Sequence, residues 1–151
     1  MLPKSESISI NCYTDASSDF NNGVHNSAVA CVIVVNGTKQ VLSASGRIIG
    51  NFSPPVAEMV GICYGLEQAK LICRDLGLTA HHIGICSDNQ SVIDICVGDS
   101  STDSIKMIKL LESIDRLCEG STSVSFQWVR GHASNTYNNM ADKLAYSILK
   151  G

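Results

Sequence analysis

A strong hairpin signal stands near the start of the chain. Residues 28–35 are almost wholly apolar and β-branched, an Asn-Gly pair follows, and residues 41–49 return to an extended pattern. An Asn-Gly pair between two such segments favours a tight turn between antiparallel strands. Before them, Ile8–Tyr13 alternates apolar and polar residues, as a half-buried strand does. The chain is therefore expected to begin with three antiparallel strands, with a turn-rich stretch at residues 17–23.

Helices and strands alternate after this start. A proline pair before Val56 predicts the entry of a helix that extends to about Leu76 and ends at Gly77. The order β-β-β-α-β-α-α-β-α predicts an α/β fold, in which helices pack on a mixed sheet. The five later elements are a strand, a short helix, an amphipathic helix, a strand and a last helix, at Ile83–Cys86, Gln90–Val97, Ile105–Cys118, Val124–Val129 and about Asn139–Leu149.

Composition limits the class of protein. The 151 residues fit one domain, expected over residues 1–151, with no linker or repeat. No apolar run approaches the roughly 20 residues needed to cross a bilayer, and the N-terminus lacks a secretory pattern. A net charge of −3 argues against a surface coated with Lys and Arg for indiscriminate nucleic-acid binding. The seven cysteines lie in apolar runs without a C-x-x-C pair, so we expect buried free thiols and a reducing, cytoplasmic setting.

Acidic residues stand at particular places in this order. Asp15 ends the first predicted strand and Asp88 follows the fourth, so parallel pairing would bring both carboxylates to one edge of the sheet. Glu58 lies in the first turn of the long helix. Gly61 and Gly65 share its face, which would let the helix lie close on the sheet. A fourth acid, Asp142, belongs to the last helix and follows a polar loop that contains His132.

Crowded carboxylates need a shifted pKa or a cation to offset their repulsion. Hard divalent ions prefer carboxylate and water ligands, and two ions about 4 Å apart can serve phosphodiester cleavage. Zinc is a poor candidate because clustered Cys and His residues are missing. Taken singly, each acid also fits an ordinary role as a turn, cap or solvated helix residue, and His132 fits a surface histidine. The metal hypothesis depends on the set of acids as a whole.

Four segments together resemble type 1 ribonuclease H, a family with the ribonuclease H-like fold. The closing segment, which follows the family pattern WVKGHxGxxxNExAD, is the specific match, and the resemblance covers nearly the whole chain. The segments read Tyr13-Thr14-Asp15-Ala16-Ser17, Ala57-Glu58-Met59, Ser87-Asp88-Asn89-Gln90 and Trp128 to Asp142. The resemblance implies a five-stranded mixed sheet whose first three strands are antiparallel, with helices on both faces.

The same resemblance implies an activity and a set of site residues. The family cuts the RNA strand of RNA/DNA hybrids with Mg²⁺ or Mn²⁺ and leaves 5′-phosphate and 3′-hydroxyl ends. Carried over, Asp15 would bridge two metal ions, with Glu58, Asp88 and Asp142 completing the ligands, and Glu58 would lie near a ribose 2′-hydroxyl. His132 would handle the attacking water or product release. Gln90 would contact the minor groove; the other implied substrate contacts are Ala16, Ser17, Asn89, Arg130 and Asn138.

Some positions depart from the family pattern. Pro54 and Pro55 replace an asparagine pair that grips the hybrid, Ala16 replaces a glycine, and Asn139 replaces a glutamate. A basic handle is missing, since residues 98–104 contain no Lys or Arg. Five other basic residues fit phosphate contact and an ordinary solvated role equally well. They are Arg47, Lys106, Lys109, Arg130 and Lys143.

Two further functions stay open at this point. The missing asparagine pair is compatible with a nuclease of the same fold that cuts a different nucleic acid. A second alternative is a non-catalytic nucleic-acid-binding domain, or one appended to a reverse transcriptase, although all four acids are present. For the ribonuclease H interpretation, we expect a monomer that binds an RNA/DNA hybrid and has neither a membrane nor a protein partner.

Overall fold

The computed structural model describes residues 7–131 and 135–151. Its elements follow the predicted order of three strands, a helix, a strand, two helices, a strand and a helix. Their bounds are β1 Ser7–Asn21, β2 Val24–Val35, β3 Val41–Gly50, α1 Pro54–Leu76, β4 Thr79–Ser87, α2 Gln90–Val97, α3 Ile105–Leu117, β5 Ser123–Trp128 and α4 Thr136–Lys150.

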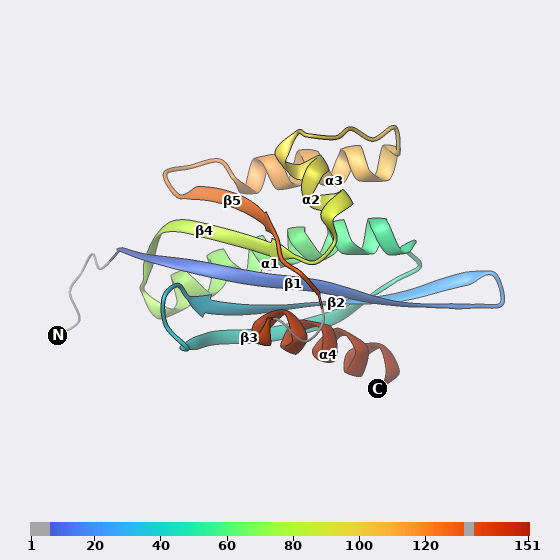
Figure 1. Ribbon diagram of the computed structural model, residues 1–151, viewed down its shortest axis with the longest axis horizontal. Helices are drawn as coiled ribbons and strands as arrows, with labels where there is room; N and C mark the ends of the chain where they lie inside the picture. Colours follow the sequence, from blue (N-terminus) through green and yellow to red (C-terminus); the bar gives the residue numbers. More distant parts are fainter. Residues whose placement is uncertain (1–6, 132–134) are drawn as a thin grey trace.

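The strands form one mixed sheet in the order β3-β2-β1-β4-β5. β1 pairs antiparallel with β2, and β2 with β3, whereas β1 with β4 and β4 with β5 are parallel. Figure 1 shows α4 in front of β1, β2 and β3, and α1 on the opposite side of the sheet. The predicted α/β fold, with three antiparallel strands first and helices on both faces, is therefore confirmed.

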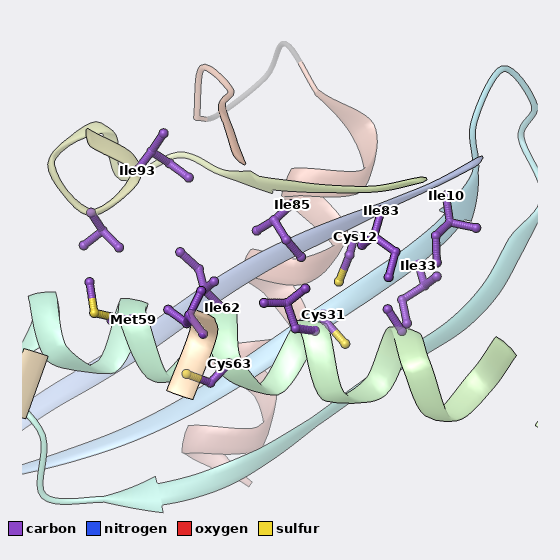
Figure 2. Packing of buried hydrophobic residues seen from close by; sticks show 14 of the residues in the cluster. Ile10, Cys12, Cys31, Ile33, Met59, Ile62, Cys63, Ile83, Ile85 and Ile93 are labelled. Atoms are coloured by element: carbon purple, nitrogen blue, oxygen red, sulfur yellow. The ribbon is translucent and has the colours of Figure 1, made fainter. Parts of the chain in front are cut away.

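β2 explains the apolar run of the hairpin signal. Its residues alternate between two hydrophobic clusters, because Cys31 and Ile33 face α1 whereas Val32 and Val34 pack with Ala141 of α4. Both faces of this strand are covered, so no polar alternation is left in its sequence. Figure 2 shows isoleucine and sulfur side chains from β1, β2, β4 and α1 meeting between α1 and the sheet.

Several boundaries differ from the predictions. β2 and β4 each begin four residues earlier than predicted, at Val24 and Thr79, and α1 begins at Pro54, which places Glu58 beyond its first turn. The stretch at 17–23 was expected to be turn-rich, but β1 continues to Asn21 and only Asn22 and Gly23 form the turn, both at positive φ. Backbone pairing with β2 from Asp15↔Ala30 to Asn21↔Val24 stabilises this polar segment as strand. Asp15 therefore lies within β1 rather than at its end. α4 begins at Thr136, three residues before the predicted start, because Asn135 caps it.

Other predictions agree closely with the structure. α2 has the predicted bounds, and α1 ends at Leu76 before Gly77, which adopts the left-handed conformation of a C-cap. All seven cysteines are free; five are buried, and Cys96 and Cys118 are half-buried. Among the described residues, no helix is long and apolar enough to cross a membrane.

Candidate active site

The carboxylates of Asp15 and Asp88 emerge at the same edge of the sheet. The parallel pairing of β1 with β4 ends at Tyr13↔Cys86, and each acid lies two residues beyond this pair. β4 ends at Ser87, whereas β1 continues past Asp15 with β2 as its neighbour. The divergence of β1 from β4 opens the space in which the two side chains meet, at the strand ends where α/β proteins place ligands.

Close packing of α1 on β1 brings the third carboxylate to this edge. A Cβ built on Gly65 would lie 2.5 Å from Cγ2 of Thr14 and 2.9 Å from Sγ of Cys12, so only glycine permits this approach. A Cβ on Gly61 would lie 3.4 Å from the carbonyl oxygen of Asp15, an ordinary contact. Glu58 precedes Gly61 by one helical turn and is thereby held over Asp15, as the glycine spacing predicted.

Asp15, Glu58 and Asp88 form the three-carboxylate cluster. One oxygen from each residue lies within 4.8 Å of the oxygens of the other two. Asp15 is only 4% exposed, and its Oδ1 accepts a hydrogen bond of 2.9 Å from the backbone N–H of Ala16. The Oε2 atom of Glu58 is buried and has no hydrogen-bond partner among the described residues. A buried acceptor without a donor is costly, so this arrangement favours a bound proton or cation.

Burial and mutual repulsion shift the pKa values of two cluster members upwards. Desolvation is the main cause for Asp15, followed by the charge of Asp88, and together they raise its pKa to about 8. Desolvation, then the charges of Asp15 and Asp88, raise the pKa of Glu58 well above its usual value. The carboxylates are therefore poorly compensated by the protein itself.

Asp142 approaches the site from the other face of the sheet. It is exposed on α4, and a side-chain hydrogen bond with Asp15 contributes to the raised pKa of Asp15. It does not belong to the group of oxygens within 4.8 Å. Three of the four predicted acids thus meet closely, and Asp142 lies near Asp15 but outside the three-carboxylate cluster. His132 lies outside the described residues.

The surroundings of Asp88 include contacts that sequence reasoning missed. The indole Nε1 of Trp128 donates 3.1 Å to the backbone oxygen of Asp88, and a Cβ on Gly131 would lie 2.9 Å from its Oδ2. The side-chain amide of Asn138 donates 3.4 Å to that same Oδ2. Both Trp128 and Asn138 belong to the closing motif. Nothing in the sequence of that motif indicates that they contact Asp88.

A family model described as RNase H matches residues 7–150. The chain belongs to the RNase H family. No match was found among curated proteins. The match agrees with the predicted resemblance, and it includes every segment that contributes a carboxylate to the edge of the sheet.

Solved RNase H structures share the fold. RNase H1 of the halophilic archaeon Halobacterium salinarum NRC-1 is 22% identical, with a TM-score of 0.78 over 94% of this chain and 98% of that one. LC11-RNase H1, solved in complex with an RNA/DNA hybrid, is 18% identical, with a TM-score of 0.79 over 93% and 96%. The protease-reverse transcriptase of prototype foamy virus is 20% identical, with a TM-score of 0.74 over 100% of this chain but 22% of that one.

The donor set of this member of the RNase H family fits a hard divalent cation. All three clustered groups are carboxylates, and Oε2 of Glu58 offers a buried lone pair without a hydrogen-bond donor among the described residues. Hard divalent cations such as Mg²⁺ and Mn²⁺ prefer oxygen ligands of this kind, whereas structural zinc sites more often include Cys or His. A cation would also offset the repulsion that raises the pKa values of Asp15 and Glu58.

The residues predicted to contact the substrate differ in exposure and in hydrogen-bond partners. Ala16 uses its N–H on Asp15, Ser17 is half-buried, and Gln90 is exposed in the first turn of α2. Asn89 caps α2 by accepting 3.0 Å from the N–H of Val92. Asn138 is 1% exposed and contacts Asp88 instead of solvent. Five basic residues that were weighed as phosphate contacts are exposed: Arg47, Lys106, Lys109, Arg130 and Lys143.

Proposed function

We propose that this protein is an endoribonuclease that hydrolyses the RNA strand of RNA/DNA hybrids and leaves 5′-phosphate and 3′-hydroxyl ends. The three-carboxylate cluster in a chain of the RNase H family is the observation that carries this proposal. Glu58 and Asp88 are half-buried rather than buried, and we propose that a polymer substrate approaches the cluster from their side. The cavities lined by Val29 and Phe52, by Cys73 and Thr79, and by Val32 and Met140 contain none of these acids.

The proposed cofactor is a pair of Mg²⁺ ions, with Mn²⁺ as a substitute. Asp15 would contact both ions, and Glu58, Asp88 and Asp142 would complete the protein ligands. When bound, such ions activate water and stabilise the leaving oxygen of a phosphodiester. Glu58 would also lie near the ribose 2′-hydroxyl, which distinguishes RNA from DNA. We assign His132 to handling of the attacking water or release of product.

The proposed substrate follows from the family and from one structural relative. LC11-RNase H1, with the same fold, was solved with an RNA/DNA hybrid. Ala16 and Ser17 follow Asp15 in sequence, and Asn89 and Gln90 follow Asp88. These four residues and Arg130 are proposed to contact the hybrid. Phosphate contacts further away would come from the exposed basic residues already named.

A matched panel of duplexes tests the substrate. RNA/DNA, RNA/RNA and DNA/DNA duplexes of one sequence are incubated with Mg²⁺ or Mn²⁺, and the products are separated on a sequencing gel. We expect cuts only in the RNA strand of the hybrid, with 5′-phosphate on the downstream product. Cleavage of another duplex in preference to the hybrid would contradict the proposed specificity.

One alternative function has a specific observation in its favour. The foamy virus relative contains this fold as 22% of a longer protease-reverse transcriptase, and Pro54 and Pro55 stand where the family has hybrid-gripping asparagines. The alternative function is that of a nucleic-acid-binding domain that has a different specificity or no catalytic activity. Such a domain could be appended to a reverse transcriptase. Binding of the hybrid without cleavage in either metal would favour this alternative.

We also propose a reducing, cytoplasmic setting and a monomeric state. The seven free cysteines support the first proposal. Sedimentation of the purified protein under reducing conditions tests the second.

A further inference from the structure

The side chain of Asn138 is buried against the acidic site. It is 1% exposed, and its Nδ2 lies 3.4 Å from Oδ2 of Asp88. A carboxylate oxygen only accepts hydrogen bonds, so the amide must present its NH₂ group to Asp88. The Oδ1 atom of Asn138 is buried and has no hydrogen-bond partner among the described residues.

The position of Asn138 is fixed by the start of α4. The side chain of Asn135 accepts hydrogen bonds from the N–H groups of Tyr137 at 3.1 Å and Asn138 at 3.0 Å. The ring of Tyr137 packs against the ring of Tyr13, with 5.5 Å between the two ring centroids. Tyr13 lies on β1, two residues before Asp15. The first turn of α4 is thus attached to the strand that carries one acid, and from there it contacts a second acid on β4.

A neutral amide suits this place electrostatically. Asp88 lies beside Asp15 and Glu58, so its carboxylate needs a partner that sets its orientation. A Lys or Arg would form an ion pair and would compete with a metal cation for the same oxygens. An amide N–H donates to the Asp88 carboxylate without bringing a competing positive charge, so the carboxylate stays available to a cation.

We propose that Asn138 is a positioning residue for Asp88 rather than a contact to the nucleic acid. It orients the Asp88 carboxylate toward Asp15 and Glu58 by donating from Nδ2. This inference rests on the proposed function, in which Asp88 is a metal ligand. Hydrogen-bond partners of metal ligands typically contribute 10–100-fold to metal affinity or activity.

Mn²⁺ binding without nucleic acid separates this role from substrate contact. Asn138→Leu keeps a side chain of similar size without the donor, and Asn138→Ser provides a smaller polar variant if leucine prevents folding. Asn139→Ala is the matched control, because Asn139 is half-buried on the same helix and is not part of the proposed site. Calorimetry gives the Kd for Mn²⁺, melting in EDTA gives the stability, and hybrid cleavage gives kcat and KM.

We expect both Asn138 variants to bind Mn²⁺ about 10-fold more weakly or worse, with a lower kcat and an unchanged KM for the hybrid. The Asn139→Ala variant should match the wild-type protein in all three. An unchanged Kd for Mn²⁺ in a folded Asn138 variant would overturn the inference, and an increased KM with that unchanged Kd would assign Asn138 to the substrate instead. A wild-type protein that neither binds Mn²⁺ nor cuts any duplex would instead reject the proposed function itself.

Discussion

At the scale of single residues, the negative charge of Asp15 is needed for the proposed activity but destabilises the metal-free protein. Asp15 is nearly buried, lies beside two other acids, and has a pKa raised to about 8. Removing a charge from such a group should relieve repulsion in the metal-free protein, whereas the proposed activity needs that charge to hold cations. One substitution should therefore have opposite effects on stability and activity.

Asp15→Asn tests this conflict. We expect Mg²⁺-dependent hybrid cleavage to fall by more than about 100-fold, as when a group that stabilises transition-state charge is removed. In EDTA at pH 8, the same variant should melt several degrees above the wild-type protein, because the asparagine carries no charge. Gel cleavage assays and thermal melting measure the two effects. Unchanged activity would show that Asp15 is not a metal ligand.

The sequence predicted these acids better than it predicted their partners. Asp15, Glu58 and Asp88 follow from their positions in the element order, because parallel strand ends and a glycine-lined helix face place them together. The contact of Asn138 with Asp88 depends on how the start of α4 packs near the end of β4, 50 residues away in sequence. No local periodicity encodes that distance, so this asparagine was expected to contact substrate.

At the scale of elements, α1 packs closely on β1 because its glycines have no side chain at the contact. The two glycines of α1 face the same strand but have different room, since a Cβ on Gly65 would clash with Thr14 and Cys12 whereas one on Gly61 would not. The depth at which α1 lies on the sheet determines where Glu58 reaches Asp15. The two glycines therefore offer a matched pair of substitutions.

Gly65→Ala should destabilise the protein by about 1–3 kcal/mol, the usual cost of forcing extra volume into a packed core. Gly61→Ala should be neutral or stabilising, because alanine favours a helix over glycine by about 1 kcal/mol and meets only ordinary contacts. Urea unfolding of both variants gives the two free energies of unfolding. Equal free energies for the two variants would contradict the close approach at Gly65.

Element boundaries show what local sequence leaves out. The segment after Asp15 is polar and turn-like, yet β1 continues because β2 supplies a continuous backbone partner. α4 starts early because the side chain of Asn135 caps it, although the apolar pattern of that helix begins later. Strand length depends here on pairing with a distant segment, and the start of α4 depends on the hydrogen bonds that the side chain of Asn135 accepts.

Asn135→Ala should weaken the start of α4. Loss of the two cap hydrogen bonds typically costs 0.5–2 kcal/mol, so the free energy of unfolding should fall by about 1 kcal/mol. Asn139→Ala, inside the same helix, is the control and should change stability little. Urea unfolding of both variants measures the difference, and an unaffected Asn135→Ala variant would show that its side chain does not cap the helix.

At the scale of the whole molecule, the acidic edge couples folding to pH and to metal. The folded pKa of Asp15 is about 8, against an ordinary value of 3.8, and the pKa of Glu58 is raised as well. Between these values the folded protein holds protons that the unfolded chain releases. The free energy of unfolding therefore decreases as pH rises through this window, and the stabilising contribution is fully present only below the unfolded pKa.

Thermal melting at several pH values in EDTA and in excess Mn²⁺ tests this coupling. In EDTA, the Tm should fall between pH 5 and pH 8, because deprotonation leaves repelling carboxylates in the folded state. In Mn²⁺, the Tm should rise over the same range, since binding needs deprotonated ligands and a ligand that binds only the folded state stabilises it. Asp15→Asn should flatten both curves, which separates the cluster from other titrating groups. A Tm in EDTA that rises from pH 5 to pH 8 would contradict the raised pKa values and, with them, the crowding of acids on which a paired-cation site depends.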